Sequence, residues 1–407
     1  MNLNENVGGI IMKSRKMMHH NEHSNNRMIM GTNITKQRLE SLDVLRGFDL
    51  FCLVALEGIM HPLAHAIDAP WFDYFMWNFT HMDWEGLSPW DLVMPLFMFM
   101  SGVSIPFALS RYRKEAVKGQ AYRRILKRVI LLWIFGMMCQ GNLLALNPER
   151  IYLYTNTLQS IAVGYLVASL LFLNTRVKTQ IGIAAGLLFT FWGCMEFISV
   201  DGYGYGNYTP DGNLAEWIDR TLLGRFRDAA TVQDGQVVFA PWYRYTWILS
   251  SLNFGVTVLT GLFAGYIAKD KIEEKKKLKL YFGTGITMVI AGWLWNFQMP
   301  IIKTIWTSSM VLVSSGYCFL LMGLFYYWID YKGHRSGITW LKVYGMNSIV
   351  AYMLANVVNF RCIGESLFYG LEQYMGSYYS FLMTLWNIGA VYVIIWFMYK
   401  RGIFLKV

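Results

Sequence analysis

The chain has 407 residues, of which 55% are hydrophobic and only 15% are charged, and its formal net charge is +10. Soluble domains average about 25% charged residues. These proportions exclude an ordinary water-soluble protein and predict an all-α, polytopic membrane protein. The positive charge then belongs with cytoplasmic loops rather than with a nucleic-acid partner, because no soluble face is left to carry it.

The first 37 residues are polar and rich in Met, Asn and His, with no apolar stretch of signal-peptide length. Residues 1–37 therefore predict a disordered cytoplasmic tail, although His19, His20 and His23 could also bind a metal. Residues 38–407 are predicted to form one transmembrane domain. We expect no metal site and no disulfide there, because the cysteines have neither metal-ligand spacing nor a pair in an outer loop.

Roughly ten apolar segments are long enough for helices that cross a hydrocarbon core of about 30 Å. Backbone groups in lipid must bond within their own segment, so each segment is predicted to be helical. The approximate ranges are 43–66, 90–110, 125–146, 156–174, 179–199, 246–268, 279–298, 306–329, 342–360 and 379–399.

The loops between these segments alternate in charge. Residues 111–128 and 269–279 are rich in Lys and Arg, whereas most loop acids lie in 67–89 and 200–245. Basic loops face the cytoplasm, so we expect both termini inside and an inner (plasma) membrane location. The glycines of 200–245 favour an irregular outer surface there rather than a helix.

The first apolar segment carries charges that are costly in lipid unless they are paired or functional. Asp43, Arg46 and Asp49 lie three residues apart, so both acids flank the arginine on one helix face. This arrangement is either a structural ion pair or a site at which Arg46 holds an anion. Glu57 lies deeper and has no obvious sequence partner, which makes it the more informative carboxylate.

At the outer end of the second segment, His81 is followed by Asp91 at the start of the helix. The histidine is either an interfacial side chain or a catalytic group. Asp91 charges the N-terminus of the helix or orients the histidine ring, and Asp83 and Glu85 are the other candidates for orienting the ring. Other polar or aromatic positions near span ends either join helices or line a cavity: Asn156, Gln159, Trp306 and Asn347.

Several motifs follow one another in an order that is specific to one family: "RLESLDVLRGFDLF", "HMDWEGLSPWDLVMPLFMFMSG", "LQSIAVGY", "IWTSSMVL", "YGMNSI" and "YKRGIFLKV". Over about residues 38–407 the chain resembles the transmembrane acyltransferases typified by heparan-α-glucosaminide N-acetyltransferase. It is expected to be the short bacterial form, without the luminal domain and extra span of the lysosomal enzyme.

The resemblance implies transfer of an acetyl group from cytosolic acetyl-CoA to a glucosamine amine across the membrane. It also implies that His81 is the active-site histidine, in a His-x-x-Trp-x-Gly-Leu context with Trp84, and that Asp91 belongs to the site. An active-site asparagine of the family is replaced, and Glu57 is the best-placed residue. The family's Asp-Pro-Glu-Gly motif is absent, and residues 243–253 stand in its place.

We therefore expect an acetyl-CoA-dependent acyltransferase that needs no metal and acts on an amino sugar or glycan outside the membrane. His81 would be a general base or a transient acetyl carrier, and the sequence leaves both mechanisms open. The acceptor is expected near Trp84, Glu85, Asn156 and Trp306. CoA phosphates are expected near Asp43, Arg46, Arg124 and Arg128. A polar channel between the two sites would be lined by Glu57, Gln159 and Asn347.

Two other classes of protein remain open. A proton-coupled secondary transporter could use Asp43, Asp49, Glu57 and His81 as a proton path. A non-catalytic membrane scaffold would have no need of a deep carboxylate. Within the enzyme hypothesis, the acceptor group is an amine or a hydroxyl, and a homodimer is compatible with the chain.

Overall fold

Helices make up almost all of the regular structure in the part of the chain that the computed structural model describes, which is residues 39–67, 69–113, 118–141 and 143–405. The prediction of an all-α membrane fold is confirmed. The predicted tail, with its possible metal-binding histidines, lies outside the described residues.

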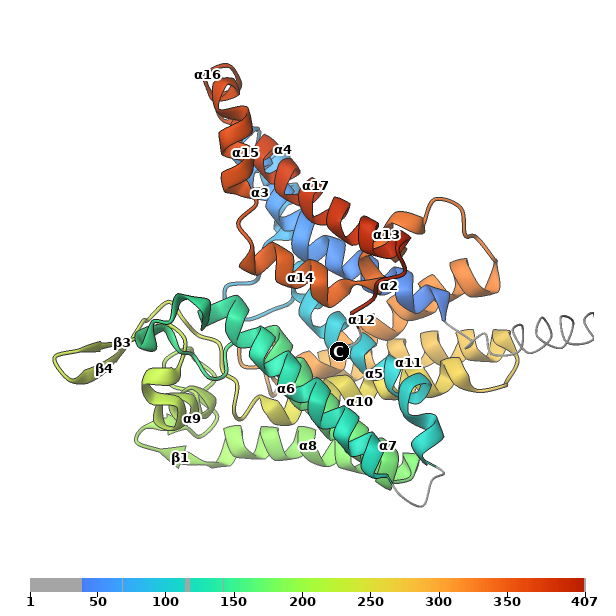
Figure 1. The fold of residues 1–407 in the computed structure, drawn as a ribbon. Coiled ribbons are helices and arrows are strands. Elements are labelled where there is room, and N and C mark those ends of the chain that lie inside the picture. The colour runs from blue at the N-terminus through green and yellow to red at the C-terminus, as the bar shows by residue number, and fades with distance from the viewer. Residues whose placement is uncertain (1–38, 68, 114–117, 142, 406–407) are drawn as a thin grey trace, which may run out of the picture. The chain divides into compact units, whose positions relative to one another are not determined.

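The order of elements along the chain shows long helices separated by short ones and by two small hairpins (Figure 1). The helices are α2 (Glu40–Phe51), α3 (Glu57–Ala66), α4 (Pro70–Met76), α5 (Val93–Arg113), α6 (Gly119–Gly141), α7 (Thr157–Asn174), α8 (Val177–Phe197), α9 (Leu214–Leu223), α10 (Ser251–Lys269), α11 (Glu274–Trp295), α12 (Ser308–Phe325), α13 (Thr339–Met346), α14 (Ser348–Val357), α15 (Arg361–Phe368), α16 (Glu372–Met375) and α17 (Tyr378–Lys400). The strands are β1 (Ser199–Val200), β2 (Tyr203–Gly204), β3 (Ala230–Gln233) and β4 (Gln236–Phe239).

Each predicted apolar segment coincides with helical structure, but not every one is a single long apolar helix. Among the described residues, six helices are long and apolar enough to cross a membrane. They are Pro89–Arg113, Thr157–Asn174, Val177–Phe197, Ser251–Lys269, Ser308–Tyr331 and Tyr378–Lys400. The chain is therefore a multi-pass membrane protein, while the number of ten spans stays a prediction.

The first predicted span contains a π-helical segment, Cys52–Leu56, between α2 and α3. The ninth is divided at Asn347 into α13 and α14. Short π-helical segments inside α-helices are rare and are frequent at functional sites. In this chain, Leu53 of the π-helical segment faces the cavity described below.

Helices α5 and α10 approach each other at backbone distance. A Cβ atom built on Gly102 would lie 2.0 Å from the carbonyl oxygen of Val258, and one on Gly261 would lie 1.9 Å from that of Phe99. Only glycine fits at such a contact, as in other closely packed membrane helices. The pair thereby fixes α5, whose preceding turn carries Asp91, against α10, the helix that follows the long loop 200–245.

The basic ends of several helices gather at one end of the bundle. Arg113 Nη2 donates to Thr175 O at 3.1 Å, Lys118 Nζ to Leu173 O at 2.7 Å, and Lys269 Nζ to Pro106 O at 2.7 Å. The chain ends of α5, α7 and α10 are thus neighbours there, next to the start of α6. This agrees with the alternation of loop charges, whereas the side of the membrane that this end faces stays a prediction.

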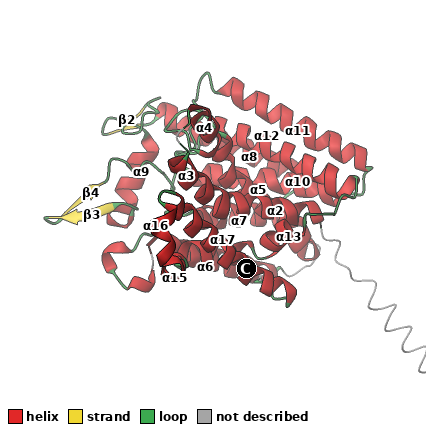
Figure 2. Cartoon of the chain, turned by 90° about the horizontal axis from the view of Figure 1, so that it is seen from above, coloured by secondary structure: helices red, strands yellow, loops and turns green. Residues whose placement is uncertain are grey.

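The segment from residue 199 to 250 forms a separate lobe beside the long helices, with α9 and both hairpins (Figure 2). The expectation of an irregular surface holds for residues 202–206, where Gly202, Gly204 and Gly206 have positive φ angles of 85°, 88° and 74°. It is wrong for α9, which Asn213 caps by accepting a hydrogen bond from Glu216 N at 2.9 Å.

Candidate active site

Asp91 lies in the short 3₁₀ turn Pro89–Leu92 that leads into α5. Ser88 N donates to Asp91 Oδ2 at 2.9 Å, and Asp91 N donates to Ser88 Oγ at 3.3 Å. This reciprocal capping follows from the Ser-Pro-Trp-Asp sequence, in which the serine caps the turn and the acid lies three residues later. The carboxylate is therefore held in a fixed position, and only 1% of the residue is exposed.

The second oxygen of Asp91 holds the ring of His81. His81 Nδ1 lies 2.8 Å from Asp91 Oδ1, and Met82 N donates to Asp91 Oδ2 at 3.3 Å. The side chain of His81 is 42% exposed, so the ring has a buried partner on one edge and an accessible remainder. A carboxylate in this position fixes the orientation and tautomer of an imidazole.

A third charged group, Lys303, completes the cluster. Its Nζ lies 2.9 Å from His81 Nδ1, 3.4 Å from His81 Nε2 and 3.3 Å from Asp91 Oδ1, and the side chain is 9% exposed. The two chain segments are joined by backbone contacts, since Gly86 N donates to Ile301 O at 2.8 Å. Sequence reasoning missed this residue, although a lone lysine on the predicted outer side departs from the positive-inside rule.

His81 and Lys303 face a cavity of about 360 Å³. Aromatic side chains from one segment, Trp242, Tyr243, Tyr245 and Trp247, form a large part of its wall. The other lining residues are Leu53, Trp90, Val93, Met94, Gln140, Thr155, Asn156, Thr157 and Tyr352. A concave site with a mostly apolar wall and a few convergent polar groups is the usual form of a small-molecule site.

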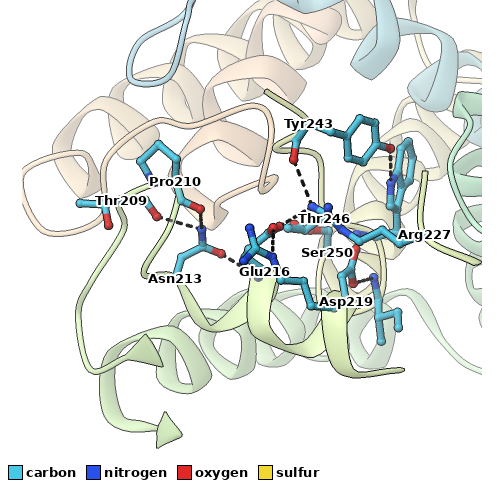
Figure 3. A network of polar contacts seen from close by, with 12 residues as sticks. Thr209, Pro210, Asn213, Glu216, Asp219, Arg227, Tyr243, Thr246 and Ser250 are labelled. Carbon is cyan, nitrogen blue, oxygen red and sulfur yellow. Dashed lines mark hydrogen bonds and ion pairs between the residues drawn. The ribbon is translucent and has the colours of Figure 1, made fainter. Parts of the chain in front are cut away.

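A buried network of charges lies behind the aromatic wall (Figure 3). Arg227 is fully buried, and its Nη2 donates to Glu216 Oε2 at 2.6 Å and to Tyr243 O at 3.2 Å. Glu216 Oε1 also accepts from Arg220 Nε at 2.7 Å. The guanidinium of Arg227 thereby ties α9 to the backbone of the cavity wall.

Asp219 anchors the same wall one turn further along α9 (Figure 3). Its carboxylate accepts from Trp247 N at 2.7 Å and from Ile248 N at 3.0 Å. Burial raises the pKa of Asp219 from 3.8 to about 7, while these two backbone hydrogen bonds lower it. The Trp247 indole in turn donates to Tyr243 Oη at 3.0 Å, so the aromatic wall is held by the folded loop behind it.

Of the residues predicted near the acceptor, Asn156 lines the cavity and the other three do not. The Trp84 indole donates to Tyr208 O at 2.9 Å, and Glu85 is exposed and forms a backbone bridge with Ile302. Trp306 is buried, with its indole donating to Thr257 Oγ1 at 3.1 Å.

Two of the three residues predicted to line a polar channel, Gln159 and Asn347, have backbone partners. Gln159 Oε1 accepts from Thr155 N and Asn156 N at 2.7 and 3.0 Å, which makes it part of the cap of α7. Asn347 Nδ2 donates to Ile403 O at 3.2 Å, at the break between α13 and α14. Glu57 begins α3, but its side chain lies outside the described part of the structure.

The residues predicted to hold CoA phosphates do not line the cavity at His81. Arg46 Nη1 lies 3.9 Å from Asp43 Oδ1. Arg124 Nη1 donates to Tyr112 Oη at 3.1 Å. The guanidinium of Arg128 lies 4.2 Å from the centroid of the Tyr165 ring, and its buried Nε has no hydrogen-bond partner among the described residues.

Comparison with known proteins relates the chain to one enzyme family. The family model described as "Heparan-alpha-glucosaminide N-acetyltransferase, catalytic" matches residues 38–201. Human heparan-alpha-glucosaminide N-acetyltransferase is 26% identical over 365 residues, which cover 78% of this chain and 52% of the human protein. The mouse protein of the same name is 24% identical over 326 residues, or 68% of this chain and 49% of the mouse protein.

The chain resembles the heparan-alpha-glucosaminide N-acetyltransferases. The resemblance predicted from the motifs is thus confirmed, and the chain spans about half the length of the curated relatives it matches. His81 and Asp91 lie inside the segment that the family model matches, whereas Lys303 and the aromatic wall follow it in the sequence.

Proposed function

We propose that the chain is a membrane-embedded acyltransferase that moves an acetyl group from acetyl-CoA on the cytoplasmic side to an amino sugar or glycan on the outer side. The observation that carries the proposal is the contact of His81 with buried Asp91 beside a partly open aromatic cavity. The names of the curated relatives support the same reaction class, the transfer of an acetyl group to a glucosamine amine.

The orientation of His81 suits either step that acetyl transfer needs. A carboxylate can only accept hydrogen bonds, so with Asp91 Oδ1 as the partner of Nδ1, at 2.8 Å, we place the ring proton on Nδ1. Nε2 then has a lone pair. As a base, Nε2 takes the proton of the acceptor amine or hydroxyl while that atom attacks the thioester carbonyl, and the proton then passes to the CoA thiolate. As a nucleophile, Nε2 carries the acetyl group itself.

The cavity suits a sugar better than a long apolar chain. Its volume of about 360 Å³ lies near the lower end of the range for small-molecule sites. Tyr and Trp side chains combine an apolar ring face with a polar tip, and both kinds of surface occur on a sugar ring. Trp242 is 73% exposed and is available to an acceptor that arrives from outside.

The donor would enter from the opposite end of the bundle. The basic residues there and the alternation of loop charges support a cytoplasmic side, with both termini inside and an inner (plasma) membrane location. Arg46, Arg124 and Arg128 are the proposed partners of the CoA phosphates. The acetyl-bearing arm of CoA would then pass between helices to reach His81.

Incubation of the purified protein with labelled acetyl-CoA and a panel of amino and neutral sugars tests the proposal. We expect transfer by the wild-type protein, and a loss of roughly 10²–10⁴-fold for His81→Ala if the histidine is a base. His334, which stacks on Trp328 and does not line the cavity, provides the matched control His334→Ala.

Acid quench without acceptor separates the two mechanisms, because only an acetyl carrier retains label on the protein. CoA should also raise the melting temperature of the folded protein, which it would not do for a transporter of unrelated solutes. A folded His81→Ala protein that transfers acetyl groups at nearly the wild-type rate would overturn the proposal.

A further inference from the structure

The cluster at His81 contains a third charged group, Lys303, in addition to the histidine and the carboxylate. Asp91 is 1% exposed, and a carboxylate so deeply buried requires a counter-charge. A neutral imidazole donates a hydrogen bond but supplies no charge. The ammonium of Lys303, 3.3 Å from Asp91 Oδ1, supplies it and makes the pair neutral while His81 is itself neutral.

The position of Lys303 also acts on the ring directly. Its Nζ is within 3.4 Å of both ring nitrogens, so an imidazolium would place a second positive charge against the ammonium. Like charges at this distance disfavour one another. Nδ1 has a single hydrogen-bonding position, and both Asp91 Oδ1 and Lys303 Nζ approach it; we take the carboxylate as its partner, which places the proton on Nδ1. The neutral ring then has its lone pair on Nε2.

We propose that Lys303 is a positioning residue that balances the charge of Asp91, so that His81 rests as a neutral imidazole with Nε2 able to accept a proton or an acetyl group. The use of this state in transfer rests on the proposed function. The state itself is a property of the resting protein and can be measured without any substrate.

The other titratable groups near His81 are exposed acids, one acid that does not line the cavity, and phenols of the cavity wall. The acids of its own loop, Asp83 and Glu85, are exposed. The amide of Gln140 separates Asp228 from the cavity by a 2.8 Å hydrogen bond. The remaining titratable groups of the described cavity wall are the phenols of Tyr243, Tyr245 and Tyr352.

NMR of protein labelled with [¹⁵N]histidine, recorded over a range of pH without substrates, tests the proposal. His81→Gln assigns the His81 signals. In Lys303→Met, His81 becomes the only positive partner of Asp91 among the described residues, so we expect its imidazolium to persist to a higher pH, by about one to three pH units. Lys303→Arg, which keeps the charge, should titrate close to the wild-type protein.

Lys277→Met is the matched control. Lys277 is also a buried lysine, 3.1 Å from Glu274, but it does not line the cavity. It should leave the His81 titration unchanged. Should Lys303→Met not fold, Lys303→Gln serves the same purpose, because its amide can still donate to Asp91 but carries no charge.

The pH profile of acetyl transfer gives a second readout. In Lys303→Met the acidic limb should move to higher pH, and in the double variant Asp91→Asn/Lys303→Met it should move back, even though the maximal rate is lower. An unchanged His81 titration in the folded Lys303 variants would overturn this role. A shifted titration in a protein that transfers nothing would leave it standing and remove the proposed function instead.

Discussion

Two clusters of buried charges lie on either side of the aromatic wall, and they differ in where their bonds lead. In the Arg227 cluster, formed by Glu216, Asp219, Arg220 and Arg227, the bonds run to each other and to backbone groups of residues 243–248. In the His81 cluster, formed by His81, Asp91 and Lys303, the histidine side chain remains 42% exposed beside a cavity. Both contain a carboxylate that is at most 1% exposed.

The difference shows that burial of charge alone does not mark a reactive site. The printed bonds of the Arg227 cluster run to its own members and to the backbone of the loop that it holds against the helices, which is a structural task, although Nε and Nη1 of Arg227 have no hydrogen-bond partner among the described residues. In the His81 cluster, Asp91 is buried and held by its partners, whereas the side chain of His81 remains 42% exposed. A titratable group whose partners are fixed on one edge, and whose other edge is accessible, is arranged for chemistry.

The sharpest way to break this comparison is to replace one buried carboxylate in each cluster. Asp91→Asn should reduce kcat/KM for acetyl transfer by roughly 10²–10⁴-fold, because an amide can no longer hold the required tautomer as a carboxylate does. Asp219→Asn, the matched change in the Arg227 cluster, should leave transfer per folded molecule near the wild-type value. Equal losses in both variants would erase the distinction.

For the free energy of unfolding we expect the opposite ranking, with the Arg227 cluster more important than the His81 cluster. Glu216→Gln removes the carboxylate that forms the ion pair with fully buried Arg227, and breaking such a pair typically costs about 3–5 kcal/mol of unfolding free energy. Thermal unfolding in detergent should show a clear drop in melting temperature. The control is Glu365→Gln, whose exposed pair with Arg361 should contribute less than about 1 kcal/mol.

A third place, the arginines at the predicted donor side, extends the comparison to binding. If Arg46 and Arg128 contact CoA phosphates, Arg46→Gln and Arg128→Gln should each weaken CoA binding by about 1.5–3 kcal/mol. Titration calorimetry or thermal shift with CoA measures this, with Arg361→Gln as the surface control. Wild-type affinity in both variants would move the phosphate site elsewhere.

The smallest effect, counted per pH unit, is the dependence of the unfolding free energy on the titration of Asp219. Burial raises its pKa in the folded state from 3.8 to about 7, so between these values the folded state binds more protons than the unfolded state. Stability should therefore fall as the pH rises from about 4 to about 7, by at most about 1.4 kcal/mol per pH unit. Asp219→Asn should flatten this slope, and an equally steep slope in that variant would assign it to another group.

Local patterns account for what the sequence could predict. The apolar segments coincide with helices, and His81 and Asp91 meet because a short capped turn joins them. Lys303 could not be placed next to them, because the contact spans 222 positions and depends on the backbone bridge between Glu85 and Ile302.

The N-termini of two helices, α7 and α9, could be predicted from the sequence. The spacing of Asn156 and Gln159 is that of a capping box, and so is the spacing of Asn213 and Glu216. The first explains why a buried glutamine in the fourth span bonds to backbone. The second could have predicted α9 inside a loop whose glycines favoured irregular structure.

The π-helical segment Cys52–Leu56 sets the rotational phase of the first span. Each residue of an α-helix turns the chain by roughly 100°, and a π turn contains an additional residue. Spacing counted from Asp49 to Glu57 therefore does not tell which face the later residue occupies. Deleting one residue from this segment would leave the hydropathy of the span nearly unchanged but would rotate α3 relative to the cavity. The hydropathy of the span therefore does not specify which face α3 turns toward the cavity.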